Sequence, residues 1–251
     1  MLSMLRKWVS DDDWRVLEPL LSRRTGCPPT TPNRVFLEAV VWKVRTGVPW
    51  RDLPKEFGSW QTIYSRFRRW ALAGRFKAIF EAMQIDVDDY WHSIDGSYVR
   101  AHQHSAGGTG GAGKNAIGPS RGGRTTKLHA RVDSEGRPIQ IEISAGNLHD
   151  SSLAATLLAN ITADAIIADK AYDVDAVIDK IEATGAAAVI PPKRNRKHKR
   201  AYSKSLYKDR NVVERFFCRL KHWRGIATRY EKTIASFRGM VHLVCAILLV
   251  R

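Results

Sequence analysis

Apolar positions in the first part of the chain recur at intervals of three and four residues, the spacing of amphipathic helices. One helix is expected after Ser10, which precedes three acidic residues and can cap it. A second runs from about Asn33 to Gly47, and a third follows Ser59. The last two helices and their connector have the order of a helix-turn-helix. We therefore predict an all-α, helix-turn-helix-like domain over residues 1–85.

From about residue 86 onward, short apolar runs alternate with helical patterns. Strands are expected at residues 90–99, 127–132, 138–144, 165–168 and 187–191. Helices are expected from about Asp150, Asp173, Asp209 and Thr233, with Asp150 and Asp173 as caps. Three strands followed by alternating helix and strand are the order of an RNase H-like α/β domain, which we predict over residues 86–251. Within it, the glycine-rich residues 101–124 predict a mobile loop without a packed core.

The balance of charged residues indicates the class of binding partner. Lys and Arg number 41 against 25 Asp and Glu, a net charge of +16, which predicts a polyanionic partner. A membrane is not expected, because the longest apolar run, residues 240–250, contains His242 and has about half the roughly 20 residues of a spanning helix. No N-terminal signal is visible, and three scattered cysteines fit a reducing compartment. We expect a cytoplasmic, nucleoid-associated protein.

Three carboxylates stand out by their positions. Asp95 lies in the first expected strand, Asp169 ends a buried strand, and Glu214 lies among apolar residues of a helix. Carboxylates inside apolar segments are costly unless something compensates their charge. A pair of Mg²⁺ ions would do so, and two such ions can activate a nucleophile and stabilise a leaving oxygen in phosphoryl transfer. The alternative is three unrelated surface or salt-bridged acids.

A second pattern surrounds the last of these acids. Tyr207, Arg210, Glu214 and Lys221 have the spacing Y-x2-R-x3-E-x6-K, and offsets of three, four and seven place them on one helix face. A simple ladder of ion pairs is the alternative, although it would not require the tyrosine.

Together these segments resemble the DDE transposases of bacterial insertion sequences, a group with a Y-R-E-K signature. Ser-Ile-Asp-Gly-Ser at 93–97 is similar to the family's first aspartate strand, and Ala-Asp-Lys-Ala-Tyr-Asp at 168–173 to its second. Trp-Arg-Asp-Leu-Pro at 50–54 and the following helix also recur in the family. The resemblance covers nearly the whole chain, with the motifs in the family's order.

The resemblance implies roles for these residues. Asp95 would bridge two Mg²⁺ ions, for which Mn²⁺ can substitute, while Asp169 and Glu214 would each complete one metal site. Tyr207, Arg210 and Lys221 would grip phosphates near the cut. Tyr172 would stack on an unpaired base, but a buried aromatic beside a strand is the favoured interpretation of this residue.

Other basic residues are candidates for DNA contact. In the third helix they are Arg66, Arg68 and Arg69, for which a solvated helix face is an equally good interpretation. In the stretch before the Glu214 helix they are Lys193, Arg194, Arg196 and Lys197, where contact with the DNA backbone is favoured over a plain solvated loop. His149 and Asp150 suggest a fourth ligand group, but packing and a helix cap are favoured; His102 and His104 are discounted as metal ligands.

The function implied is an insertion-sequence transposase. Its helical domain would bind the transposon ends, and its RNase H-like domain would cleave them and transfer the 3′-OH into target DNA. The partners would be double-stranded DNA, as terminal inverted repeats and target, and further copies of the chain in a homodimer or higher synaptic complex. Two alternatives remain open. One is a non-catalytic DNA-binding repressor derived from a transposase, and the other is a nuclease of the same fold without strand transfer.

Overall fold

The structure is a computed structural model that describes three stretches of the chain, residues 9–21, 30–84 and 87–250. The chain divides into two compact units. The helical unit comprises Met1–Ile85, Ala101–Gly111 and Leu220–Arg251. The α/β unit comprises Asp86–Arg100 and Ala112–Arg219. This division keeps a boundary at residue 85, but it places Ala101–Gly111 and Leu220–Arg251 with the first unit, whereas the prediction has residues 86–251 as one domain.

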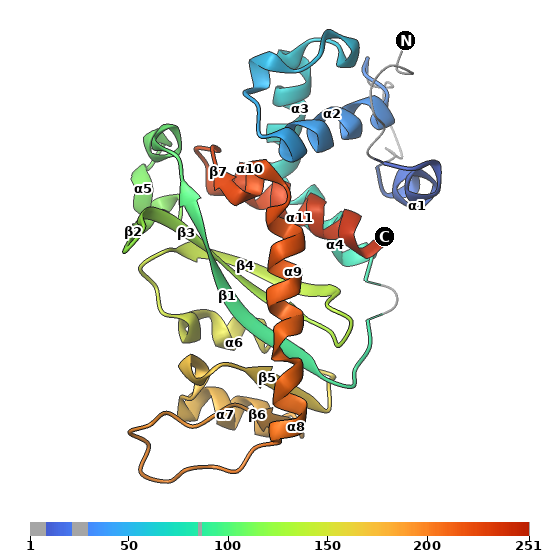
Figure 1. Ribbon diagram of the computed structural model, residues 1–251. Coiled ribbons are helices and arrows are strands. Elements are labelled where there is room, and N and C mark those ends of the chain that lie inside the picture. Colours follow the sequence, from blue (N-terminus) through green and yellow to red (C-terminus); the bar gives the residue numbers. More distant parts are fainter. Residues whose placement is uncertain (1–8, 22–29, 85–86, 251) are drawn as a thin grey trace. The chain divides into compact units, whose positions relative to one another are not determined.

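The helical unit contains four helices from the first part of the chain and a long one from its last part (Figure 1). Its elements are α1 (Asp11–Leu21), α2 (Asn33–Thr46), η2 (Trp50–Asp52), η3 (Lys55–Phe57), α3 (Trp60–Leu72), α4 (Arg75–Ala82), η4 (Gln103–Gly107), α10 (Arg224–Ala227), β7 (Thr228–Arg229) and α11 (Ile234–Val250). The predicted cap of α1 is confirmed, since Ser10 Oγ accepts from Asp13 N at 3.0 Å and Asp13 Oδ2 from Ser10 N at 3.1 Å.

The connection between α2 and α3 spans residues 47–59. Gly47 ends α2 in the left-handed conformation at φ 74°, as the sequence predicts. Ser59 occupies the N-cap position of α3, but its hydroxyl makes no capping hydrogen bond. Because the connection contains η2 and η3, it is longer than the three to four residues of a tight helix-turn-helix.

Helix α11 supplies much of the core of the helical unit. Most of its side chains are buried, including Phe237, Met240 and Leu243. It packs on α3 and α4, and a Cβ at Gly239 would stand only 3.0 Å from Phe76 Cδ2 and 3.1 Å from Ala71 Cβ. A helix that is apolar on nearly every face must be surrounded, which explains why it joins the other helices. Within the described ranges, no helix is long and apolar enough to cross a membrane.

The α/β unit is built on a mixed sheet. Its strands are β1 (His92–Ala101), β2 (Gly118–Ser120), β3 (Gly123–Val132), β4 (Pro138–Ala145), β5 (Ala165–Ala168) and β6 (Ala187–Val189). The order is β2-β3-β1-β5-β6, with β4 also paired to β3. β1 is antiparallel to β3 and parallel to β5, and β5 is parallel to β6. The predicted order, a helical region followed by a mixed α/β sheet, is confirmed.

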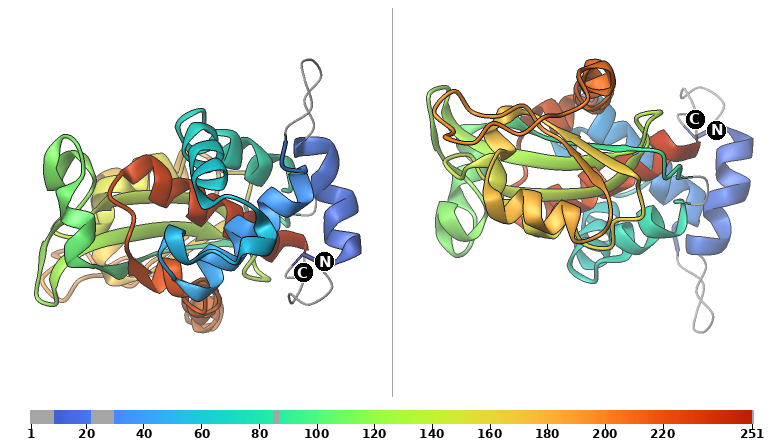
Figure 2. Two further views of the ribbon diagram at one scale, coloured as in Figure 1. Left: turned by 90° about the horizontal axis from the view of Figure 1, so that it is seen from above. Right: turned by 90° about the horizontal axis from the view of Figure 1, so that it is seen from below.

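Helices cover both faces of this sheet. One face packs Ile94, Ile166 and Ala168 against α6 (Ala154–Leu157) and α7 (Asp175–Glu182). The other face packs Ala165 and Ile167 against α8 (Lys204–Tyr207), which leads through η7 (Lys208–Arg210) into α9 (Asn211–Lys221). Figure 2 shows α7 and α9 on opposite sides of the strands. The alternation of side chains along β1 and β5 therefore decides which residues face α9.

The glycine-rich stretch at 101–124 is more ordered in the structure than the sequence predicts. Besides η4, it contains α5 (Gly111–Lys114), β2 and the start of β3. Ala116 and Ile117 are 8% and 3% exposed, and a Cβ at Gly118 would overlap the Asn147 side chain. Gly118 therefore packs closely against Asn147 and Ala145.

Candidate active site

Asp95 lies in β1, and Asp169 directly follows β5, the parallel strand beside it. The register pairs Ile94 of β1 with Ala168 of β5, so the residue after each member of this pair is one of the two aspartates. Ala168 faces α6 and α7, and the alternation along β5 turns Asp169 toward the α9 side. Asp95 Oδ1 accepts from Gly96 N at 2.7 Å, and Asp169 Oδ1 accepts from Ala171 N at 2.7 Å.

The environment of Asp95 disfavours its ionised form. Its side chain is 19% exposed, and burial raises the pKa of Asp95 to about 6. The backbone N–H of Gly96 and the charge of Arg210 lower this pKa, whereas the charges of Asp169 and Asp150 raise it. Asp95 lies beside Asp169 and Asp150, so a cation is needed nearby if all three carboxylates are to be ionised.

In the structure, a guanidinium supplies part of that positive charge. Arg210 Nη1 lies 3.3 Å from Asp95 Oδ2, and its Nη2 lies 2.5 Å from Glu214 Oε1. Glu214 is half-exposed on α9. Arg210 therefore links the acid on β1 to the acid on α9. Among the described residues, no three acidic, histidine or cysteine side chains are grouped closely enough to hold a metal ion.

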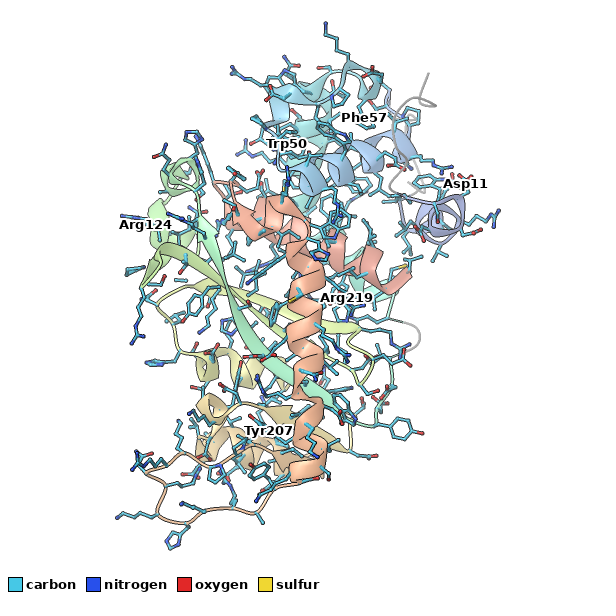
Figure 3. All side chains as sticks on the ribbon, viewed as in Figure 1. Asp11, Trp50, Phe57, Arg124, Tyr207 and Arg219 are labelled. Carbon is cyan, nitrogen blue, oxygen red and sulfur yellow. The ribbon has the colours of Figure 1, made fainter. Side chains whose placement is uncertain are left out.

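Tyr207 and Lys221, the other two members of the Tyr-Arg-Glu-Lys pattern, lie on either side of Arg210 and Glu214 along the chain. Tyr207, labelled in Figure 3, ends α8 and packs beside β5, with its ring centroid 5.6 Å from that of Tyr202. Burial raises the pKa of the Tyr207 hydroxyl, so it stays protonated and can donate a hydrogen bond. Lys221 is the last residue of α9 and belongs to the helical unit.

A fourth acid lies close behind β1. The Asp150 carboxylate is 2.8 Å from the Lys127 ammonium, whose side chain is 2% exposed. A Cβ at Gly96 would overlap Asp150 Oδ1 and stand 3.0 Å from Lys127 Cε. Asp150 is therefore not the predicted helix cap: His149 holds the N-cap position of η5 (Asp150–Leu153) and is exposed rather than packed. The ion pair was not predicted, because nothing in the pattern couples two residues so far apart in sequence.

Tyr172 lies in the core rather than in the site. Its side chain is 0% exposed and packs with Ile94, Ile166 and Ala168. Burial raises the pKa of its hydroxyl. Stacking of this ring on a base, expected from the resemblance, is incompatible with this position because the ring has no open face.

The basic segment at 193–200 is held by hydrogen bonds to Asp173, four residues after Asp169. Asp173 accepts from Lys193 N at 2.7 Å and from Arg196 Nε and Arg200 Nη2, each at 2.8 Å. Asp173 is thus not the predicted cap of α7, whose N-cap is Val174. The Arg196 guanidinium also pairs with Asp175, so this predicted DNA contact is already engaged within the protein. Lys193 is partly exposed, and Arg194 and Lys197 are exposed.

The three arginines of α3 have different environments. Arg66 is 8% exposed, donates to Thr31 O at 2.9 Å and to the Asn33 side chain, and lies 4.2 Å from the centroid of the Phe36 ring. A buried guanidinium with these partners stabilises the α2–α3 packing and is not available to DNA. Arg68 and Arg69 are exposed, as a DNA contact would require.

Comparison with known proteins decides the family. A family model described as "Transposase DDE domain" matches residues 92–249, and one described as "Putative transposase of IS4/5 family" matches residues 9–80. The chain belongs to the DDE transposase family. It is 39% identical over 132 residues to the "Putative transposase for insertion sequence element IS6501" of Brucella ovis, covering 51% of this chain and 99% of the relative. It is 32% identical over 112 residues to the "Insertion element IS402 uncharacterized 16.2 kDa protein" of Burkholderia cepacia, covering 39% of this chain and 76% of the relative.

Solved transposase structures also match this transposase. A cryo-EM structure of the piggyBac transposase synaptic complex with hairpin DNA matches 92% of this chain and 69% of that chain, at 10% identity and a TM-score of 0.49. A crystal structure of the Mos1 mariner paired-end complex with Mn matches 92% and 82%, at 15% identity and a TM-score of 0.32. The family membership confirms the prediction of an insertion-sequence transposase of the DDE type.

Proposed function

We propose that this transposase cleaves the terminal inverted repeats of its own element and joins the freed 3′-OH to target DNA, using Asp95, Asp169 and Glu214 with two Mg²⁺ ions. The observation that carries the proposal is that Asp95 and Asp169 each directly follow one member of the Ile94–Ala168 pair of β1 and β5, while Arg210 links Glu214 to Asp95. Two divalent ions would activate the attacking oxygen and stabilise the leaving one. Mn²⁺, which also accepts carboxylate oxygens, would substitute.

The donor set fits such ions in chemistry. Asp95 and Asp169 offer carboxylate oxygens, the ligands that Mg²⁺ prefers, and the Asp95 carboxylate is partly buried, with its pKa raised despite the nearby Arg210. Glu214 completes the set only when it releases Arg210, because the two are paired at 2.5 Å. We therefore infer that the guanidinium of Arg210 moves from the carboxylates to a DNA phosphate, to which it can bind with two parallel hydrogen bonds.

The DNA-contacting surface is inferred from accessible polar and basic residues and from the net charge of +16. On the α/β unit it comprises Tyr207, Arg210, Arg194, Lys193 and Lys197, with Lys221 further along α9. On the helical unit it comprises Arg68 and Arg69. Since two transposon ends must be held at once, we propose that the working form is a homodimer or a higher synaptic complex.

The test is a cleavage assay on labelled DNA that carries the element's ends, with Mg²⁺ or EDTA. We expect metal-dependent cutting that Asp95→Asn abolishes, because the amide keeps the shape but not the charge. Asp179→Asn is the matched control, since Asp179 is an exposed acid of the same unit on α7.

The products separate the alternatives. A joined product establishes strand transfer, whereas cutting without any joined product identifies a nuclease. End-specific binding with no cutting by the wild-type protein would replace the proposal with a non-catalytic repressor.

A further inference from the structure

The helical unit contains a cavity of about 490 Å³ that the transposition chemistry does not use. It lies where the end of α2, the η2 turn, η4 and the start of α11 meet, and Figure 3 labels Trp50 on its wall. Its volume is within the roughly 300–1,000 Å³ typical of small-ligand sites. It is lined by Trp50 of the Trp-Arg-Asp-Leu-Pro motif, by His104 of η4 and by His102 at the N-cap of η4, none of which has a role in the active site.

Two groups of aromatic rings line this cavity. In the first, the Trp50 and Tyr64 ring centroids are 5.3 Å apart. In the second, His104, His102 and Tyr230 follow one another, with centroid separations of 4.6 and 4.9 Å. Rings from separate chain segments that converge on one cavity offer π-faces to a planar occupant.

The second group of rings is held in place from behind. His102 N donates to Arg229 O at 2.9 Å, next to Tyr230. Arg229 is 0% exposed, and its Nε donates to Glu231 O at 3.0 Å. Tyr230 and His104 nevertheless remain exposed at the cavity. A rigid support with open rings is the arrangement of a preformed binding site rather than of a closed core.

The cavity also contains a buried ion pair. Lys43 Nζ lies 3.5 Å from Glu231 Oε1, with the two side chains 2% and 9% exposed. Trp50 Nε1 donates to the same oxygen at 3.2 Å. Replacing such a pair by apolar residues is often neutral or stabilising, so it is poorly explained by stability alone. It gives an aromatic cavity a polar edge that can recognise hydrogen-bonding groups.

We propose that this cavity binds one unstacked nucleobase of the DNA that the transposase holds, stacked on Tyr230 and the histidines. A planar, uncharged ring with polar edges suits both the aromatic walls and the Lys43–Glu231 edge. An ammonium ligand does not, because Lys43 and Lys232 already line the cavity. The inference rests on the proposed function in that it takes DNA as the ligand, and stacking on aromatic side chains is a general means of holding single bases.

The test uses fluorescence anisotropy of full-length protein, in EDTA, with a labelled duplex carrying the element's terminal repeat. A companion set of duplexes carries one abasic residue at each position in turn. For wild-type protein, we expect one position at which losing the base weakens binding roughly tenfold, the size of one stacked base. Tyr230→Leu should weaken binding to the intact duplex roughly tenfold and should show no further loss at that position.

Two further variants complete the design. Tyr90→Leu removes a tyrosine that is 76% exposed in the α/β unit, and it should bind like the wild type. His104→Ala removes an exposed ring of the same wall, and it decides the matter if Tyr230→Leu fails to fold.

The inference is overturned if Tyr230→Leu and His104→Ala bind the intact duplex as the wild type does. It is also overturned if, at every position of the duplex, the loss of binding affinity caused by the variant adds to the loss caused by the abasic residue. If the wild-type protein cuts the element's ends in Mg²⁺ while these variants match it, only the cavity is misassigned. If the wild type binds no element DNA, the proposed function fails as well.

Discussion

His129 gives the fold a dependence on pH that can be calculated. The side chain is 0% exposed on β3, its Nε2 lies 2.8 Å from Ser144 Oγ, and its Nδ1 is buried without a hydrogen-bond partner. The pKa of His129 is lowered to about 4, chiefly by burial; the charge of Asp150 opposes this lowering and that of Lys127 adds to it. The folded protein therefore resists protonation of this ring, whereas the unfolded chain accepts a proton near pH 6.5.

The sign and size follow from this difference. Because the folded pKa is the lower one, stability is full above about pH 6.5 and is lost as the pH falls toward about 4. The largest possible loss in the free energy of unfolding is about 3 kcal/mol, and the loss between about pH 7.5 and about pH 5 is roughly 2 kcal/mol. His129→Gln, which does not titrate and can still bond to Ser144, should remove this part of the pH dependence.

The assay is urea unfolding of both proteins across this pH range, with stability taken from the midpoint and slope. Acids that titrate in the same range affect both proteins alike, so the difference between them isolates the histidine. His222→Gln, which changes an exposed histidine, should retain the wild-type pH dependence. If acidification lowers the free energy of unfolding equally in the wild type and in His129→Gln, the role given to His129 is wrong.

Three further outcomes are expected. Arg66→Lys should destabilise the protein by about 2 kcal/mol in urea unfolding, because a lysine cannot reproduce the forked hydrogen bonds or the ring contact, whereas Arg68→Lys should change stability by less than about 0.5 kcal/mol. Asp173→Asn should speed tryptic cleavage between residues 193 and 200, read by mass spectrometry, because that segment loses its anionic anchor. Gly96→Ala should lower stability by about 1–3 kcal/mol, because its methyl group overlaps Asp150, and unchanged unfolding would contradict the packing behind β1.

The local pattern of apolar and polar residues predicts many of the helices and strands. The three- and four-residue spacing and the cap residues predicted α2 and α3, and the apolar run at 165–168 predicted β5. The position of Asp95 within β1 and that of Asp169 directly after the buried β5 also agree with the sequence pattern, whereas the pairing of these two strands was not predicted.

The features that could not be predicted depend on contacts between distant residues. Arg66 and Arg68 look alike in the sequence, and only the packing of Phe36 against α3 separates a buried arginine from an exposed one. The resemblance alone places Tyr172 in the site, whereas the turn after β5 directs its ring into the core, as the alternative interpretation of a buried aromatic expects. The anchoring of Arg196 by Asp173 joins loops 23 residues apart, which no helical or strand period encodes.

The return of α11 to the N-terminal helices has a consequence for how the protein is made. α4 ends at Ala82 and α11 begins at Ile234, so the ribosome adds the entire α/β unit between them. At about 5–20 residues per second, this interval lasts on the order of ten seconds, during which the apolar faces of α3 and α4 lack their largest partner. A nascent or truncated chain that stops before α11 therefore cannot complete the helical unit. Under the proposed function, DNA-end recognition by the helical unit is therefore acquired only by chains that already carry the whole α/β unit.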